Sequence, residues 1–136
     1  MTGAIRPIAL AAAQRGDDLL VFEGLDRPFY RPLGGGIEFG ETAVAALHRE
    51  MREELAVDLS DVKLLGVLEN IFTTPDGPGH EIAFIFTATL ADPAMYARDT
   101  VGTVLDDGSP VTWQPKSRFR SGEATLYPDG LIDLLR

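Results

Sequence analysis

Three glutamates stand close together in a segment that favours a helix. Residues 42–55 contain no Gly or Pro and are rich in Ala, Leu, Glu and Arg, a composition that predicts a helix. At about 100° per residue, Glu50, Glu53 and Glu54 fall on one arc of that helix, where their like charges repel. Carboxylate oxygens are ligands for hard cations such as Mg²⁺, and a phosphate can share the bound ion. The spacing therefore predicts a metal site on one side of the helix.

The neighbouring helix positions are predicted to divide between core and ligand. The expected buried stripe lies beside the carboxylates and consists of Val44, Leu47, Met51 and Leu55. Ala43 and Ala46 lie in or near the carboxylate arc, where small side chains leave room for a bulky anionic group and its metal. Arg49, one turn before Glu53, offsets only part of the negative charge.

A run of three glycines, Gly34, Gly35 and Gly36, precedes the predicted helix. Such a backbone can approach a ligand closely or adopt positive φ, and a loop that leads into a helix start commonly binds phosphate. A tight turn from a strand into a helix also needs glycine. The run alone leaves both interpretations open.

Together, the glycines and glutamates resemble the signature of the Nudix hydrolases, the Nudix box. That signature is a Gly and a Glu at fixed spacing, followed by Arg-Glu-hydrophobic-any-Glu-Glu-any-Gly-hydrophobic. In this chain five residues separate Gly35 from Glu41, seven separate Glu41 from Arg49, and residues 49–57 read REMREELAV. Met51 stands for the usual aliphatic residue, a harmless change because Met is adaptable. Ala56 replaces the usual Gly, and Ala adopts a left-handed helix end reluctantly, so the end of the helix is expected to differ slightly.

The resemblance implies a role for each matching residue. Glu50, Glu53 and Glu54 match glutamates that bind Mg²⁺ or Mn²⁺ in Nudix hydrolases, and the main-chain carbonyl of Gly34 matches a position that can also touch the metal. One of these glutamates often serves as the general base. We expect Glu53 to be that base, with Glu50 as the second catalytic glutamate.

Other residues are expected to support this site. Glu41 and Arg49 match a pair that braces the loop against the helix in the family. Similar hairpins follow the box in many Nudix proteins, where a further acidic residue can join the metal site. Glu81 is the candidate here, in preference to Glu69, because it begins the more hydrophobic strand. Either residue equally suits a solvated strand end.

Two residues just before the glycines are candidate substrate contacts. Arg31 suits a substrate phosphate, and Tyr30 can stack on a base. An ordinary solvated Arg and a packed Tyr explain the same two residues equally well.

The composition indicates a single domain over residues 1–136. Hydrophobic residues make up 45% of the chain and charged residues 24%, close to globular averages, so neither disorder nor membrane insertion is indicated. With 12 basic and 21 acidic residues the net charge is −9, which argues against long nucleic acid as a partner. Several of the acids lie in the box, where divalent ions would reverse the local sign. The absence of cysteine excludes a disulfide framework and a thiol nucleophile.

The first half of the chain predicts strands around the box helix. The Ala-rich run within residues 5–14 is short and interrupted by Pro7, so it does not read as a secretion signal, and a cytoplasmic protein is expected. A turn at residues 15–18 precedes a strand at 19–23. After the box, strands at 62–72 and 80–90 are expected to form a hairpin, and they flank a dense turn signal at 73–79.

The second half predicts shorter elements. We expect a helical turn within residues 92–98 and a strand at 111–114, followed by a loop at 115–122. Its basic residues Lys116, Arg118 and Arg120 are typical of a solvated face, and a short helix is expected within residues 126–135. These elements and the resemblance together predict an α/β (α+β) fold. In this Nudix-type α/β/α sandwich, a curved mixed sheet lies between the box helix and the C-terminal helix.

The leading hypothesis is metal-dependent hydrolysis of a diphosphate linkage in a nucleoside diphosphate derivative. The substrate would be a small molecule: a nucleotide, a nucleotide sugar or a dinucleoside polyphosphate. The alternative is a non-catalytic nucleotide sensor on the Nudix fold, which the intact carboxylates disfavour. An isomerase of the same fold lacks its usual cysteine, and a plain calcium site leaves the upstream Gly and Glu unexplained. A homodimer is possible, as in many relatives.

Overall fold

The computed structural model describes residues 3–24, 29–105 and 107–135 of the chain. Its elements follow one another as β1 (Ile5–Ala12), β2 (Gln14–Arg15), β3 (Asp18–Glu23), β4 (Tyr30–Arg31), β5 (Leu33–Gly36), α1 (Ala43–Leu55), β6 (Leu59–Thr74), β7 (Gly77–Leu90), the 3₁₀ helix η1 (Pro93–Ala97), β8 (Thr100–Thr103), β9 (Pro110–Pro115), α2 (Lys116–Arg120) and α3 (Leu131–Leu134). No helix among the described residues is long and apolar enough to cross a bilayer.

The strands form two sheets. The first has the order β5-β1-β7-β6; β1 runs parallel to β7 and antiparallel to β5, and β6 runs antiparallel to β7, so this sheet is mixed. The second sheet has the order β2-β3-β9-β8, with β4 paired to β3. Because β5 pairs with β1 and leads into α1, the first sheet fixes where the box helix packs.

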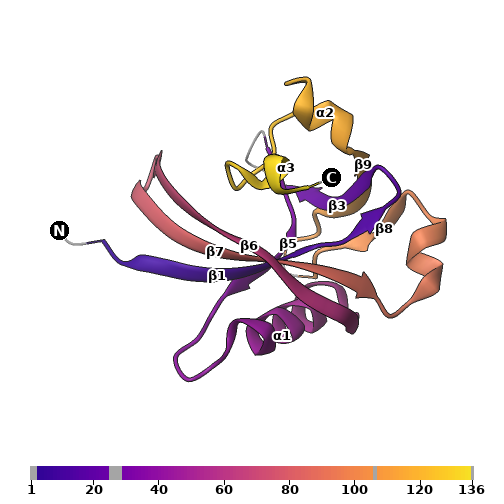
Figure 1. Cartoon of the computed structure of the whole chain (residues 1–136), viewed down its shortest axis with the longest axis horizontal. Coiled ribbons are helices and arrows are strands. Elements are labelled where there is room, and N and C mark those ends of the chain that lie inside the picture. The colour runs from indigo at the N-terminus through magenta and orange to yellow at the C-terminus, as the bar shows by residue number, and fades with distance from the viewer. Residues whose placement is uncertain (1–2, 25–28, 106, 136) are drawn as a thin grey trace.

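Two core clusters lie on opposite faces of the first sheet. Figure 1 shows α1 on one side of this sheet and α2 and α3 on the other. Alternate residues of β1 belong to different clusters, as a strand requires: Ala9 packs with Leu47 of α1, whereas Ile8 packs with Phe119 of α2 and Leu131 of α3. The expected α+β sandwich with a curved mixed sheet is confirmed, although a second sheet is present and the C-terminal helical layer consists of two short helices.

Helix α1 matches its prediction to within one residue but is rotated relative to the expected stripe. Thr42 caps it, accepting a hydrogen bond from the Ala45 amide at 3.1 Å. Val44 was predicted to be buried and is 42% exposed, whereas Ala46 is fully buried. The buried face is therefore shifted toward the carboxylate arc. Ala46 lies in the core and cannot leave room for a ligand, so that expectation was wrong.

Two further predictions needed correction. In the hairpin of β6 and β7, Thr74 pairs with Gly77, so the turn is much shorter than the predicted 73–79. The predicted loop at 115–122 contains helix α2 instead. Lys116 is 1% exposed, and its Nζ donates to Gln14 Oε1 at 2.5 Å. It is therefore not part of a solvated face, because its stem is buried and a strand distant in sequence supplies an acceptor.

Candidate active site

The glycine strand β5 lies directly against the carboxylates of α1. Glu54 Oε1 accepts a hydrogen bond from the Gly34 amide at 3.0 Å. A Cβ added at Gly35 would lie 2.6 Å from the carboxyl carbon of Glu50, which is too close for any side chain. This close approach explains why the strand carries glycine here. It also explains the rotation of α1, since the helix turns Glu50 and Glu54 toward β5.

Arg49 connects the loop before α1 to the helix. Its Nε and Nη2 donate to the two carboxylate oxygens of Glu41 at 2.8 and 2.9 Å, and Nη2 also donates to the Gly36 carbonyl at 2.9 Å. This bidentate contact lowers the pKa of Glu41 to about 2, helped by a hydrogen bond from the Glu38 amide. The same contact raises the pKa of Arg49. The arrangement has the geometry expected of a pair that braces the loop.

The remaining nitrogen of Arg49 reaches two of the candidate metal ligands. Nη1 donates to Glu50 Oε1 at 3.0 Å and lies 3.3 Å from Glu53 Oε2. The Glu50 side chain is 17% exposed and the Glu53 side chain 59% exposed. Glu50 is thus fixed between Arg49 and the glycine strand, whereas Glu53 reaches into solvent from the next turn.

The donors of this cluster suit a hard divalent cation. Glu50, Glu53, Glu54 and the main chain of Gly34 offer only oxygen ligands, which Mg²⁺ and Mn²⁺ prefer. The narrow space beside Gly35 shows that the carboxylates and the glycine backbone are built to lie close together. Within residues 3–24, 29–105 and 107–135, no three acidic or histidine side chains converge on one point as a ligand set.

Glu81 lies on the opposite face of the first sheet from α1. Ile85 shares its face of β7 and packs with the core cluster of α2 and α3, whereas Phe86 packs toward α1. The two carboxylate oxygens of Glu81 accept hydrogen bonds from Arg6 Nη1 at 3.2 Å and from the Tyr127 hydroxyl at 2.5 Å. The structure does not bring Glu81 together with the box glutamates, and its role as a metal ligand stays a prediction.

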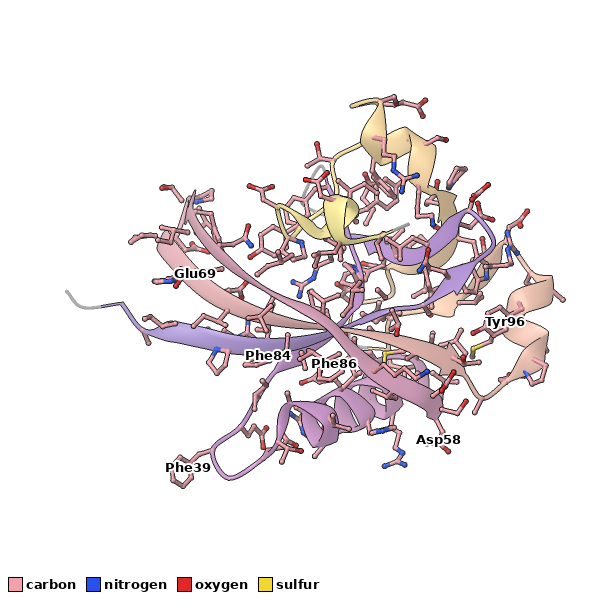
Figure 2. All side chains as sticks on the ribbon, viewed as in Figure 1. Phe39, Asp58, Glu69, Phe84, Phe86 and Tyr96 are labelled. Carbon is pink, nitrogen blue, oxygen red and sulfur yellow. The ribbon has the colours of Figure 1, made fainter. Side chains whose placement is uncertain are left out.

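Glu69, the other candidate for that role, lies near the far end of the hairpin. Its carboxylate pairs with His80 at 3.0 Å and is 62% exposed. Figure 2 shows Glu69 far along β6 from α1, while Phe84 and Phe86 lie between the sheet and the helix. Glu69 is therefore separated from the box glutamates.

A cavity of about 600 Å³ opens on the Glu81 face of the sheet. Its walls combine aromatic rings with charged groups, and the lining residues are Arg6, Phe22, Gly24, Phe29, Arg31, Phe72, Thr73, Thr74, Glu81, Asp107 and Tyr127. The ring of Tyr127 lies 5.7 Å from those of Phe29 and Phe72. Burial and the neighbouring Glu81 carboxylate raise the pKa of the Tyr127 phenol. A pocket with aromatic walls and a few polar groups is typical of a small-molecule site.

Of the two candidate substrate contacts, Arg31 lines this cavity and Tyr30 does not, and the substrate role of both stays a prediction. Burial lowers the pKa of Arg31, and the charges of Glu81 and Glu54 partly oppose that shift. The Tyr30 ring instead packs edge-on against Phe119 at 5.8 Å. The structure thus brings Arg31, but not Tyr30, to the cavity.

The family of this chain is decided by comparison with known domains. A model of the NUDIX domain matches residues 5–116, which is most of the chain. The chain belongs to the Nudix family. The resemblance of residues 35–57 to the Nudix box is thereby confirmed.

Solved Nudix structures share the fold. The MutT NUDIX hydrolase from Burkholderia pseudomallei is 20% identical, with 85% of this chain and 86% of that chain covered, at a TM-score of 0.66. A NUDIX hydrolase from Nitrosomonas europaea is 19% identical over 96% of this chain and 86% of that chain, at 0.64. The mMutator MutT protein from Bacillus halodurans is 16% identical over 86% of this chain and 72% of that chain, at 0.63. At these identities the likeness shows the Nudix fold alone.

The sequence did not identify Arg6 or Tyr127 as site residues of this Nudix domain. Arg6 is directly opposite Glu81 in the parallel pair of β1 and β7. The available signal was a pair of opposite charges, each near the start of a strongly apolar strand. Nothing near Tyr127 in the sequence points to Glu81, because the contact depends on how the C-terminal segment folds back over the sheet.

Proposed function

We propose that this Nudix hydrolase cleaves a diphosphate linkage in a nucleoside diphosphate derivative, with Mg²⁺ or Mn²⁺ bound by Glu50, Glu53, Glu54 and the main chain of Gly34. The observation that carries the proposal is the close packing of the box carboxylates against the glycine strand. Glu54 bonds the Gly34 amide, and the Glu50 carboxylate occupies the space that a Cβ at Gly35 would need. Carboxylates held this close repel one another, and a cation that they share would offset that repulsion.

The chain's own residues supply the rest of the chemistry. A bound ion stabilises negative charge on the diphosphate oxygens. Of the two glutamates in the box helix that contact Arg49, Glu53 is the more exposed. It accepts the proton of the attacking water. The oxygen of that water forms a bond to phosphorus, and the bond from phosphorus to the leaving oxygen breaks. Arg49 holds Glu50 in place through Nη1. The aromatic cavity, which Arg31 lines, receives the organic part of the substrate.

The test is a turnover assay with a panel of substrates. Purified protein is incubated with Mg²⁺ or Mn²⁺ and with nucleoside triphosphates, nucleoside diphosphates, nucleotide sugars and dinucleoside polyphosphates, and the phosphate products are quantified. We expect cleavage of at least one compound and its loss in EDTA. Glu53→Gln should lower kcat by roughly 100-fold or more, because it removes the base.

A matched control separates this role from a general loss of negative charge. Glu123 is also an exposed glutamate paired with an arginine, Arg118, at 2.6 Å, but it lies beyond α2, on the other side of the sheet from α1. Glu123→Gln should retain wild-type turnover. Equal activity of Glu53→Gln and the wild type at saturating metal would remove Glu53 as the base. Absence of turnover with every compound, combined with stabilisation by a nucleotide, would favour the sensor.

A further inference from the structure

Arg31 carries a half-buried charge that no described carboxylate neutralises by direct contact. Its Nε is buried and has no hydrogen-bond partner among the described residues. The other arginines near this site are paired: Arg49 with Glu41 at 2.8 Å, and Arg6 with Glu81 at 3.2 Å. A half-buried guanidinium whose Nε–H has no acceptor is costly, so the fold retains it for a reason other than stability.

The surroundings of Arg31 hold its guanidinium toward the cavity. Its Cζ lies 5.8 Å from the centroid of the Phe22 ring, a cation–π contact that fixes its position without neutralising it. The main chain of Arg31 pairs with Phe22 between β4 and β3. Both residues line the cavity. The two Nη atoms of Arg31 are not among the buried unpartnered atoms and have no hydrogen-bond partner among the described residues, so they are suited to bind an acceptor supplied by a ligand.

The acids that line the cavity are already engaged. Both oxygens of Glu81 accept hydrogen bonds, from Arg6 and from Tyr127. Asp107 accepts a hydrogen bond from the Ser109 amide at 2.8 Å. Arg31 is therefore the charged group of the described lining that has no hydrogen-bonded counterpart, and an anion is the partner that would both accept its hydrogen bonds and balance its charge.

We propose that the cavity binds a substrate half that carries its own acidic group, a carboxylate or a phosphate, and that this group binds Arg31. The inference rests on the proposed function, because it concerns the half of the substrate that is distal to the cleaved diphosphate. Anion recognition by the planar guanidinium of Arg31 is directional, which suits both a carboxylate and a phosphate. The enzyme is accordingly selective for diphosphates with an acidic substituent.

The diphosphate itself is not the partner of Arg31 in this arrangement. The box glutamates that would hold a metal are absent from the described lining of the cavity, whereas Arg31 belongs to it together with the aromatic walls. A contact to the diphosphate would affect all substrates alike. A contact to a distal acid affects only substrates that possess one, and this difference provides the test.

Two matched substrate pairs test the proposal on the whole protein. UDP-glucuronate and UDP-glucose differ by a carboxylate, and NADP and NAD differ by a phosphate, so the two arms separate the two kinds of anion. We expect kcat/KM for at least one acidic member to exceed that of its neutral partner by roughly tenfold or more, the usual size of a charge-assisted contact. No preference in either pair would overturn the proposal, and this comparison needs no variant.

The variant Arg31→Met then assigns the preference to its residue. The ratio of kcat/KM within the preferred pair should fall toward one. The control Arg6→Gln removes an arginine of the same cavity that is already paired and is 58% exposed in its side chain, and it should keep most of the ratio. An equal loss for both members of a pair in Arg31→Met would show that Arg31 binds the diphosphate or supports the fold, and would overturn the proposal.

A binding measurement keeps this inference separate from the proposed hydrolysis. In EDTA, the acidic member of a pair should raise the Tm of wild-type protein more than the neutral member does, and Arg31→Met should abolish the difference. If no compound is hydrolysed but this difference is seen, the catalytic proposal fails while the inference stands. If hydrolysis occurs without any difference in binding or in kcat/KM, the inference alone fails.

Discussion

The two faces of the first sheet hold two parts of the candidate site that are built in different ways. On the α1 face, the contacts of Glu54 with Gly34 and of Arg49 with Glu41 join residues of one short stretch of chain. On the opposite face, Arg6 and Glu81 are 75 residues apart in sequence, and Glu81 and Tyr127 are 46 apart. The first part is local in sequence, and the second depends on the completed fold.

From this difference we infer that the box carries out the cleavage and that the cavity selects the substrate. Helix geometry and a glycine strand are enough to place the box glutamates, so this part tolerates change elsewhere in the chain. The cavity depends on the register of β1 with β7 and on the C-terminal segment that carries Tyr127. Changes in the cavity should therefore alter which substrate is bound, whereas changes in the box should alter how fast it is cleaved.

The largest expected effect comes from the centre of the box. Arg49→Met leaves Glu41 and Glu50 without their shared cation, so the loop and the helix lose their fixed geometry. We expect kcat to fall by roughly 100-fold, the usual cost of misplacing catalytic groups. Nucleotide binding in EDTA, measured by the shift in Tm, should persist because the cavity lies on the other face.

Arg52→Met is the matched control for this change. Arg52 lies on the same helix and pairs with Asp58 at 2.7 Å, but both side chains are more than 60% exposed, at 64% and 63%. Exposed pairs contribute little, so kcat should change little. Loss of metal-free nucleotide binding in Arg49→Met would show that the two faces are coupled and would break the comparison.

The local part is also the part that the sequence predicted well. The limits of α1 follow from a run without Gly or Pro, and the contact of Arg49 with Glu41 is one that the family resemblance implied, whereas the cap at Thr42 was not predicted. The buried stripe was less accurate at Val44, because the wheel gives the spacing of side chains but not the rotation of the helix. That rotation is set by the approach of Glu54 to Gly34, a tertiary contact.

Long-range contacts account for the other errors. Lys116 was expected on a solvated face because lysine usually lies there, yet it is buried and bonds Gln14, 102 residues away in sequence. The cavity was not predicted for the same reason, since its polar lining residues Arg6, Glu81 and Tyr127 come from three distant segments. Local patterns carry no information on which of these segments meet.

A smaller effect should separate the two faces in metal binding. Glu54→Gln removes a carboxylate that we propose as a metal ligand and should weaken Mn²⁺ binding by roughly tenfold or more. Glu81→Gln should leave Mn²⁺ affinity little changed, because Glu81 bonds Arg6 and Tyr127 on the opposite face. Free Mn²⁺ can be titrated by electron paramagnetic resonance on the protein without substrate.

The two variants decide between the prediction from sequence and the position in the structure. A loss of Mn²⁺ affinity in Glu81→Gln as large as in Glu54→Gln would place Glu81 among the metal ligands, as the family resemblance implies. Unchanged affinity would leave Glu81 as a residue of the cavity. Thermal unfolding of both variants in EDTA shows whether either change disturbs the fold.

The smallest expected effect concerns the departure of the box from the family signature at Ala56. The residue takes the left-handed conformation, with φ 52° and ψ 41°, at the end of α1. This conformation is strained for alanine and not for glycine, although glycine loses more entropy on folding. Ala56→Gly should raise the free energy of unfolding by about 0.5–1 kcal/mol, seen as a higher urea midpoint.

Ala45→Gly is the control on the same helix, and we expect it to lower the free energy of unfolding. Ala45 is exposed within the helical part of α1, so glycine there adds only the entropic cost, and stability should fall by about 1 kcal/mol. If both substitutions destabilise the protein equally, Ala56 is not strained in solution and the helix ends differently. If the two substitutions change stability in opposite directions, Ala56 is strained in solution as it is in the structure. The contacts of Glu50 and Glu54 with β5 then hold the end of the helix in this conformation.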